Sequence, residues 1–407
     1  GDHRDLHYPL RRQRQMCIRD RHYTSTDLDN VFHILHLSDL HITTLGKAQI
    51  YRAQLETDLI QELNVKRLDY LVISGDIASH STPDEYQAAF DLLDGLVKRF
   101  GLDARRVVIV PGNHDLNWDL AEQAYPFVAK RKLPDALPED QYIPAGEAGV
   151  LLRSEELYQQ RFAYFNQHFY RKVYGGLAYP LNHEEQGILY FHPEDKLLFL
   201  SFNSAWEIDH HYIHRASINS AALARALDQL QDDAYQDWIK IAVWHHPVVG
   251  SEMMPNDFLQ TLATHNFQIC LHGHVHDAFE GLYKYDPRLG LHIIGAGAFG
   301  APAKNQPGVP LQYNLLTFDP VESKITVETR KKEKPDGMWF ADARWGDKNN
   351  PKPRYAINLK ADRNSKEKLR VKVFEALSPE PYAAYEVGLR NLLAVSYTHL
   401  TLPTKRI

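Results

Sequence analysis

The first third of the chain alternates short apolar runs with longer amphipathic stretches. Apolar, β-branched runs at Phe32–Leu37, Tyr70–Ser74 and Val107–Val110 predict three buried strands. Apolar positions at helical spacing predict helices over 54–65 and Pro83–Phe100, and the second begins with the proline that helix starts favour. Strands that alternate with helices are typical of βαβ units, so we expect an α/β fold with a sheet covered on both faces.

The pattern becomes irregular between 117 and 186, where proline and glutamate clusters precede an aromatic-rich amphipathic helix predicted near 155–174. We interpret this segment as a cap-like insertion. Further strands are predicted at Leu197–Phe202, 239–244, 267–271, 292–295, 311–318 and 324–330. The polar stretch 331–353 contains Gly, Asn and Pro and predicts a long loop. We therefore expect one domain over 22–360 and a C-terminal extension over 361–394.

Neither end of the chain fits this pattern. Residues 1–21 lack the apolar core of a signal peptide, and residues 395–407 show no periodicity. Back-translated, the two ends can be written as reverse complements of one another, and both resemble a translated sequencing-library adapter. We interpret them as artefactual and expect a metagenomic source whose natural termini are undefined. A basic arm that binds nucleic acid is the alternative interpretation of the N-terminal end.

The composition is that of an ordinary globular protein. The 407 residues are 44% hydrophobic, and no run of about 18 apolar residues predicts a membrane-spanning helix. Because the two ends carry eight basic and three acidic residues, removing them changes the net charge from −6 to −11 and leaves Cys270 as the single cysteine. An acidic chain with one cysteine is typical of a cytoplasmic protein, and it disfavours both a disulfide framework and general nucleic-acid binding.

Five short polar segments each follow a predicted strand. They are Ser38-Asp39-Leu40-His41, Gly75-Asp76-Ile77-Ala78, Gly112-Asn113-His114-Asp115, Trp244-His245-His246-Pro247 and Gly273-His274-Val275-His276. Ligands of α/β sheets bind at the carboxyl ends of strands, so we expect these segments to meet in one crevice. Side chains two residues apart on an extended chain point to the same side, so Asp39 with His41, and His274 with His276, can each chelate one cation. Imidazole and carboxylate together suit Mn, Fe, Zn, Co or Ni rather than calcium.

The five segments resemble the calcineurin-like metallophosphoesterase superfamily, whose pattern is D-x-H, G-D, G-N-H-D/E, H and G-H-x-H in that order. The resemblance implies a four-layer sandwich of two packed mixed β-sheets flanked by helices, here with a helical cap insertion. It also implies two divalent metal ions, one held by Asp39, His41, Asp76 and His276, the other by Asp76, Asn113, His245 and His274. Of the two adjacent histidines, His245 is the expected ligand because it lies nearer the strand end, with His246 as the alternative.

The resemblance further implies phosphoester hydrolysis by a hydroxide that bridges the metals together with Asp76. His114 would contact phosphate or protonate the leaving group, and Asp115 would orient His114. Position 79 is Ser79, where the purple-acid branch of the family has a tyrosine ligand, so an Fe(III) site is not expected. The block at Asn113 reads N-H-D, as on the phosphodiesterase-like side of the family, which favours a phosphodiester over a monoester.

A small phosphoester or nucleotide-like substrate is the expected partner, with neither a membrane nor general nucleic-acid binding. A repair-type exonuclease of the same superfamily is the alternative enzyme, although the acidic charge disfavours binding to a phosphate backbone. Outside the enzymes, the alternative is a metal-binding signalling module of a larger protein, with a further domain beyond Ala394.

Two local patterns have competing interpretations. His210, His211 and His214 could form a third metal site, but a polar loop without a chelating pattern favours the rim of a substrate cleft or plain surface. Residues 295–300 match G-x-G-x-x-G, yet Pro302 follows and no helical pattern does. This context predicts a small-residue strand end packed behind the metal site rather than a dinucleotide site. Cys270 is expected to be an inert core residue.

Overall fold

A computed structural model describes residues 31–359, except 135, 138–139, 231–232, 251–252, 287–288 and 301–308. The adapter-like ends, 1–21 and 395–407, and the predicted extension over 361–394 lie outside the described residues. Within the described part of the chain, no helix has the length and apolar character that crossing a membrane requires.

The first sheet is built around strand β1 (Phe32–Leu37), which pairs in parallel with β2 (Tyr70–Ser74). Strand β2 pairs in parallel with β3 (Val107–Val110). The other half of the sheet is antiparallel and consists of β13 (Leu311–Asp319), β14 (Lys324–Lys332), β15 (Phe340–Ala341) and β18 (Arg354–Asn358). The sheet is therefore mixed, and its parallel half is the part that the first three predicted strands form.

The second sheet has the strand order β11, β12, β10, β9, β8, β7. Its strands are β7 (Gly187–His192), β8 (Leu197–Phe202), β9 (Ile239–Val243), β10 (Ile269–His272), β11 (Phe279–Asp286) and β12 (Leu289–Gly295). The inner strands run parallel, and the two edge strands are antiparallel to their neighbours. The sequence does not predict β7, because most of this edge strand is only half-buried and its pattern is weak.

Alternate residues of the parallel strands divide between two cores. Ile34 points into the core between the two sheets, where it joins Val243 of the second sheet. Leu35, the next residue, lies in the core beneath helices α2 (Leu45–Thr57) and α3 (Pro83–Phe100). This period-two alternation is that of strands buried on both faces, as the apolar runs predict.

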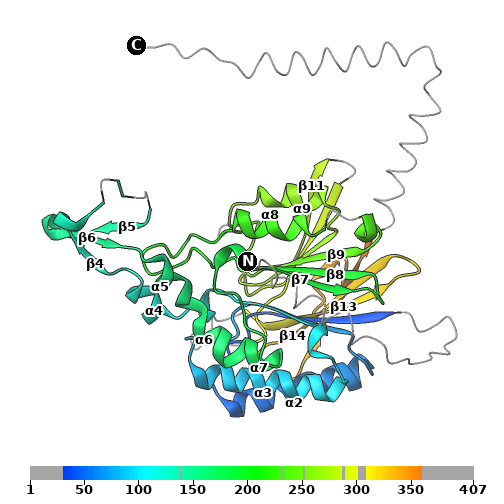
Figure 1. The fold of residues 1–407 in the computed structure, drawn as a ribbon. Helices are drawn as coiled ribbons and strands as arrows, with labels where there is room; N and C mark the ends of the chain where they lie inside the picture. Colours follow the sequence, from blue (N-terminus) through cyan, green and yellow to red (C-terminus); the bar gives the residue numbers. More distant parts are fainter. Residues whose placement is uncertain are drawn as a thin grey trace, which may run out of the picture.

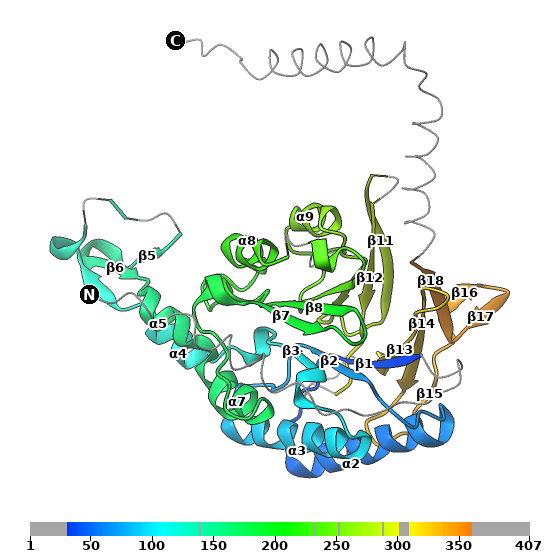
Figure 2. The same cartoon turned by 45° about the vertical axis from the view of Figure 1, so that its right-hand side comes forward.

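Helices also cover the outer face of the second sheet. These helices are α8 (Ser220–Asp228) and α9 (Phe258–Thr264), whose apolar residues share a core with β8, β9 and β10. Figures 1 and 2 show the resulting order of layers: α2 and α3, the first sheet, the second sheet, then α8 and α9. The structure confirms the predicted fold of two packed mixed sheets flanked by helices.

Helix α3 shows why local signals predict a helix well. The Thr82 hydroxyl accepts a hydrogen bond from the Glu85 N–H, and the Glu85 carboxylate accepts one from the Thr82 N–H. Pro83 occupies the first turn, and Gly101 ends the helix in a left-handed conformation. The helix predicted over 54–65 differs more, because α2 begins at Leu45 and continues beyond Thr57 as a π-helix over Asp58–Glu62.

The segment 117–186 contains more strand than the sequence predicts. Beyond α4 (Trp118–Gln123) lies a small antiparallel sheet of β4 (Phe127–Ala129), β5 (Tyr142–Pro144) and β6 (Gly149–Leu152). It projects from the body of the molecule in Figures 1 and 2. The helix predicted near 155–174 forms, but with interruptions, as α5 (Glu155–Gln159), α6 (Ala163–Phe165) and α7 (Arg171–Val173) joined by 3-10 and π turns.

The prediction of one long loop over 331–353 is wrong. Strand β14 extends to Lys332, β15 pairs with it, and β16 (Trp345–Asp347) and β17 (Asn350–Lys352) form a hairpin. Strands β15, β16 and β17 have two or three residues each and are mostly exposed, so no hydrophobic alternation marks them in the sequence.

Candidate metal centre

The loops after five strands meet at one edge of the sandwich, and backbone hydrogen bonds join the loop after β1 to that after β2, and the loop after β9 to that after β10. The Asp39 N–H donates to the Gly75 carbonyl at 3.0 Å, and the His41 N–H donates to the Asp76 carbonyl at 3.2 Å. The Gly273 N–H donates to the His245 carbonyl at 3.0 Å. The predicted meeting of these segments at the carboxyl ends of the strands is therefore present.

Asp39, His41 and His276 form one group of ligand atoms. His276 Nε2 lies 3.2 Å from Asp39 Oδ1, and His41 Nε2 lies 4.0 Å from the same oxygen. The three ligand atoms all lie within 4.8 Å of one another, although the residues come from two loops more than 200 positions apart. The Asp39 and His41 side chains are buried, whereas the His276 side chain is 35% exposed.

Asp76 lies between this group and a second set of histidines. Its Oδ2 is 3.2 Å from His245 Nε2 and 4.0 Å from His41 Nε2. His274 Nδ1 is in turn 3.3 Å from His245 Nε2. Asp39, Asp76 and His245 offer atoms within 4.8 Å of one another, so the two sets share their carboxylates.

A backbone hydrogen bond orients His245. Its Nδ1 donates to the Ser74 carbonyl at 2.7 Å, because a carbonyl can only accept, and this leaves Nε2 directed at Asp76. His246 instead has its Nδ1 2.8 Å from Ser204 Oγ, although its ring also lies 4.6 Å from that of His274. The geometry therefore agrees with His245 as the ligand shared with Asp76, while His246 is close enough to complete a group with His245 and His274.

Ser204 is a supporting residue that no pattern in the sequence predicts. Its hydroxyl oxygen accepts hydrogen bonds from the His245 and His246 N–H groups at 3.2 and 3.1 Å. It is fully buried at the end of β8. No motif marks this serine, because its partners lie 41 and 42 positions away in the sequence.

Two observations indicate that the site is built for metal ions. His41 Nε2 and Asn113 Oδ1 are buried and have no hydrogen-bond partner in the described part of the chain. Native proteins rarely leave buried polar atoms unsatisfied, and a cation would satisfy both. The donor set of imidazole nitrogens, carboxylates and one amide oxygen also suits first-row divalent ions.

The backbone around the site is strained. Five expected ligands have left-handed backbone conformations, with φ of 50° at Asp39, 44° at His41, 52° at Asp76, 70° at His274 and 55° at His276. Each such residue costs about 1–3 kcal/mol and persists only where the surrounding structure imposes it, most often at functional sites. The clustering of these conformations on the predicted ligands points to function in the same place as the side-chain geometry.

The carboxylates are held in the ionised form. Burial alone would raise the pKa of Asp76, but the charge of His245 and its hydrogen bond hold that pKa well below its ordinary value. Burial would likewise lower the pKa of His245, yet Asp76 raises it to about 9. Burial keeps the pKa of His41 below its ordinary value, so this imidazole is neutral at pH 7 and can bind a cation.

Glycines let the loops approach closely. A Cβ at Gly112 would overlap Asp76 Oδ1, and one at Gly75, whose φ is 101°, would overlap the His245 ring. These two positions explain why the G-D and G-N-H-D segments require glycine before the ligand residue.

His114 and Asp115 lie where expected, but not as a pair. His114 Nδ1 donates to the Ser79 carbonyl at 2.9 Å, and the His114 N–H donates to Asp76 Oδ1 at 2.8 Å. The Asp115 carboxylate accepts instead from the N–H groups of Ile77, Ala78 and Gly112. The expectation that Asp115 orients His114 is thus corrected: the Ser79 carbonyl orients the ring, and Asp115 ties together the loops that carry Asp76 and Asn113.

Burial raises the pKa of Asp115 to about 7, with a further contribution from the charge of Asp76. The backbone N–H groups that this carboxylate accepts from oppose that rise. Its role in this structure is therefore to hold the loops rather than to contact the imidazole.

The histidine cluster after β8 lies outside the metal-ligand groups found in the described residues. The His210 and His211 rings are 3.9 Å apart, and Tyr125 meets the His211 ring edge-on at 4.8 Å. Asp209 anchors this loop, since its carboxylate accepts from the hydroxyls of Tyr125 and Tyr158 at 2.7 and 3.1 Å.

The glycine-rich segment after β12 packs behind the metal loop, as predicted. The Phe299 and Gly300 N–H groups donate to the Ser38 and Asp39 carbonyls, both at 2.9 Å. Cys270 is a buried free thiol in β10, and burial raises its pKa well above the ordinary value, in agreement with an inert core residue.

Known proteins resemble this chain in sequence and in structure. The uncharacterized metallophosphoesterase-like protein YydB of Bacillus subtilis (strain 168) is 24% identical over 248 residues, which are 60% of this chain and 48% of YydB. The chain therefore spans about half the length of the curated relative that it matches.

Two solved structures cover 75% of this chain. GAP50, the anchor in the inner membrane complex of Plasmodium, is 12% identical, with a TM-score of 0.40 and 86% of its own chain covered. A 5'-nucleotidase from Candida albicans SC5314 is 13% identical, with a TM-score of 0.35 and 52% of its own chain covered.

The profile of the calcineurin-like phosphoesterase family matches residues 32–278. This region runs from the first residue of β1 to just beyond His276, and it includes all five polar segments and the strands that place them. Motifs, fold and site geometry agree with this match, and the chain belongs to the calcineurin-like phosphoesterase family.

Proposed function

We propose that the protein hydrolyses a phosphoester with two divalent metal ions, and that phosphodiesters are preferred to monoesters. One observation carries the proposal: the buried carboxylate of Asp76 lies between two sets of histidines, with Oδ2 3.2 Å from His245 Nε2 and 4.0 Å from His41 Nε2. A carboxylate in this place is suited to bridge two cations, since each set supplies imidazoles to one of them.

The ligands divide between the two ions by position. Asp39, His41, Asp76 and His276 would hold one ion, and Asp76, Asn113, His245 and His274 the other. When bound, two such ions lower the pKa of a shared water and neutralise charge on the phosphoryl oxygens. The hydrogen bond from His245 Nδ1 to the Ser74 carbonyl orients His245 as a metal ligand, and Ser204 supports the loop that carries His245.

His114 is the residue that we place against the substrate. Its Nδ1 is committed to the Ser79 carbonyl, so Nε2 is the atom left to contact a phosphoryl or leaving-group oxygen. The ring is half-buried and packs edge-on to His41 at 4.9 Å, at the border of the ligand group. A protonated imidazole there can donate its Nε2 proton to the departing alkoxide, and the Ser79 carbonyl holds the ring in the orientation for that donation.

The substrate that we infer is a small or nucleotide-like phosphoester. Support comes from the N-H-D form of the third segment, which resembles the phosphodiesterase-like side of the family. The acidic balance of the chain supports a small substrate over a nucleic acid, because binding along a phosphate backbone needs clustered Lys and Arg.

The test uses bis(4-nitrophenyl) phosphate as the diester and 4-nitrophenyl phosphate as the monoester, each assayed with Mn²⁺, Co²⁺, Ni²⁺, Zn²⁺ and Fe²⁺. We expect metal-dependent turnover that is faster on the diester. Asp76→Asn should lower kcat by about a hundredfold or more, since a bridging ligand supports several kcal/mol of charge stabilisation. Glu147→Gln, a change at an exposed residue of the β5–β6 turn, is the control and should keep full activity. Absence of turnover with all five metals would refute the proposal.

A further inference from the structure

The loop between β10 and β11, which carries His274 and His276, is held differently at its two ends. At its start, the Gly273 N–H donates to the His245 carbonyl and the His274 N–H donates to Asp39 Oδ2, both at 3.0 Å. Among the described residues, no hydrogen bond joins the backbone of His276 to another backbone group. The backbone of His276 is nevertheless left-handed, with φ of 55°, a conformation that persists only where the surrounding structure imposes it.

Two side chains from outside the loop hold the residues that follow His276. The Ala278 N–H donates to Gln312 Oε1 of β13 at 2.9 Å, and the Ala278 carbonyl accepts from Arg344 Nη1 at 2.9 Å. The same guanidinium nitrogen lies 2.6 Å from Asp277 Oδ1. Both main-chain polar groups of Ala278 and the side chain of Asp277 are therefore fixed by Gln312 and Arg344.

Asp342 joins these two side chains into one network. Its Oδ2 accepts from Gln312 Nε2 at 2.6 Å and from Arg344 Nε at 2.7 Å. Asp342 and Gln312 are buried, and the missing side chain of Gly297 leaves the space that Gln312 occupies. Hydrogen bonds to an ionised group are among the stronger ones, so the buried carboxylate fixes the direction of the guanidinium.

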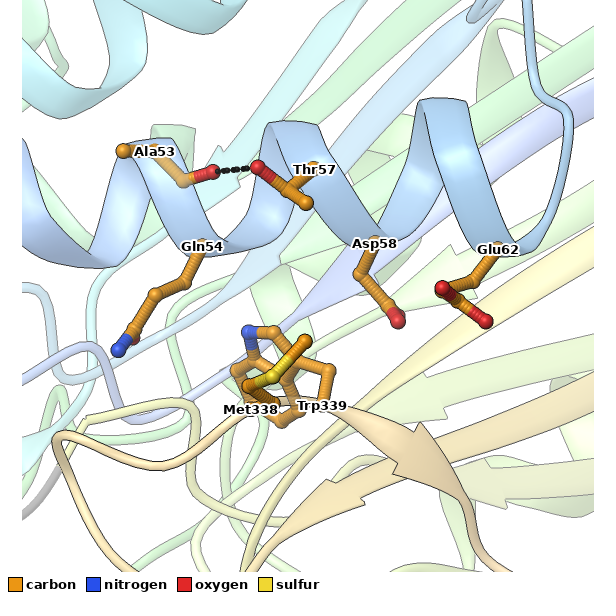
Figure 3. Close-up of a pocket in the computed structure, with 7 residues that line it drawn as sticks. All are labelled: Ala53, Gln54, Thr57, Asp58, Glu62, Met338 and Trp339. Carbon is orange, nitrogen blue, oxygen red and sulfur yellow. Dashed lines mark hydrogen bonds between the residues drawn. The ribbon is translucent and has the colours of Figure 1, made fainter.

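The segment 339–345, which carries this part of the network, is itself held in place. Trp339 is 5% exposed and stacks on Phe299 at a centroid distance of 5.6 Å, and Figure 3 shows it on the wall of a cavity opposite the helix. The Asp342 N–H donates to the Thr329 carbonyl of β14 at 3.0 Å. The segment lies beyond the region that the family profile matches, so support for the last ligand comes from outside that region.

We propose, on the basis of the proposed two-metal function, that Arg344 is a positioning residue for the ion that His276 would hold. Arg344 fixes Asp277 and Ala278, and these residues fix the backbone that directs the His276 imidazole at Asp39 Oδ1, 3.2 Å away. The His276 side chain is 35% exposed, whereas Asp39 is buried, so fewer neighbouring atoms confine this imidazole. Residues that orient a ligand change metal affinity without touching the ion.

The test measures binding of Mn²⁺ to the metal-free full chain, from the electron paramagnetic resonance signal of the free ion. His276→Ala identifies the binding step that depends on His276, and His274→Ala identifies the other step. Arg344→Met removes every donor of the guanidinium, whereas Asp277→Asn, at an exposed side chain, removes only the ion pair. Arg354→Met, the same change at an exposed arginine of β18, is the matched control. Urea denaturation checks that each variant is folded.

We expect Arg344→Met to weaken the step that depends on His276 about tenfold. The other step should change by about twofold or less, because the bonds that hold His274 do not involve Arg344. Loss of a positive charge would by itself strengthen binding of a cation, so weaker binding reports lost positioning. Asp277→Asn should weaken the same step about two- to threefold, and Arg354→Met should bind both ions as the parent does.

The inference is overturned if folded Arg344→Met binds both ions as tightly as the parent, or if it weakens both steps equally, as a general structural role would. A parent that binds one ion contradicts the proposed two-metal function instead. The inference is then decided by whether Arg344→Met weakens the step that His276→Ala weakens. A parent that binds no Mn²⁺ overturns both.

Discussion

At the scale of single residues, the two oxygens of Asp76 have different tasks. Oδ2 faces the histidines on both sides, whereas Oδ1 accepts the His114 N–H at 2.8 Å. The missing Cβ of Gly112 leaves the space that Oδ1 occupies. The same carboxylate thus sets the position of the proposed ligands and of the residue that we place against the substrate.

His114 should matter most when the leaving group is a poor one. We expect His114→Gln to lower kcat about a hundredfold or more on a dialkyl or nucleotide-like diester, because an alkoxide must be protonated as it leaves. The same variant should lose much less on bis(4-nitrophenyl) phosphate, whose leaving group departs as a stable anion. The measurement is kcat for both substrates at saturating metal. Equal losses on the two substrates would show that His114 does not protonate the leaving group.

Single residues also show where sequence reasoning succeeds and where it fails. That the expected ligands lie close together was predictable, because each lies within a few residues of a strand end, in a short pattern such as Asp39 and His41. The supporting contacts of Ser204 and the Ser79 carbonyl were not, since the first depends on folding across 41 positions and the second involves a backbone atom. The expected pairing of Asp115 with His114 is wrong because the side chains of these adjacent residues face different partners: His114 faces the Ser79 carbonyl, and Asp115 faces backbone N–H groups.

At the scale of elements, a buried arginine joins the interrupted helix over 155–173 to the loop after β8. Arg161 is completely buried, and its guanidinium donates to the carbonyls of Tyr158, Trp206 and Ile208. It also lies 3.3 Å above the centre of the Tyr158 ring. Burial lowers its pKa to about 10, which still leaves it charged at neutral pH.

Removing the Arg161 side chain should destabilise the folded protein. We expect Arg161→Ala to lower the free energy of unfolding by about 3 kcal/mol, because three carbonyls lose a buried charged donor. Arg171→Ala, an exposed change on the same interrupted helix, should stay within about 0.5 kcal/mol of the parent protein. Chemical denaturation of both variants provides the comparison. Equal stability of the two variants would mean that the guanidinium contributes little to this junction.

The elements themselves were predictable to different degrees. Strands β1 to β3 and helix α3 follow from continuous apolar runs and from clear start and stop residues such as Thr82 and Gly101. The hairpin of β16 and β17 and the small sheet beyond α4 were not predictable, because strands of three or four residues are too short to carry a periodic signal. Backbone pairing, rather than sequence pattern, defines these elements.

At the scale of the molecule, several buried histidines lie outside the metal-ligand groups of the described residues, such as His183 and His192. His192 is 4% exposed, and its ring packs edge-on against Tyr70 at 4.8 Å. Burial, followed by the charge of Arg106, lowers its pKa from 6.5 to about 4. The folded protein therefore keeps this imidazole neutral over a pH range in which the unfolded chain binds a proton.

This difference predicts a loss of stability in acid. As pH falls from 6.5 toward 4, the unfolded state gains a proton at His192 that the folded state refuses, so the free energy of unfolding decreases. His192→Phe removes this contribution, and its stability should fall less steeply than that of the parent, by up to about 1.4 kcal/mol per pH unit. Urea denaturation of both proteins at several pH values between 6.5 and 4.5 measures the two slopes. Parallel slopes would contradict the prediction.

The central claim is that Asp76 joins two metal ions in one hydrolytic site. The most direct measurement titrates metal-free protein with Mn²⁺ and follows both bound metal and hydrolysis of bis(4-nitrophenyl) phosphate. We predict that turnover is absent without metal and rises until two ions are bound per chain, and that Asp76→Asn never reaches this state. Full turnover with one ion bound, or turnover in the metal-free protein, would contradict the account.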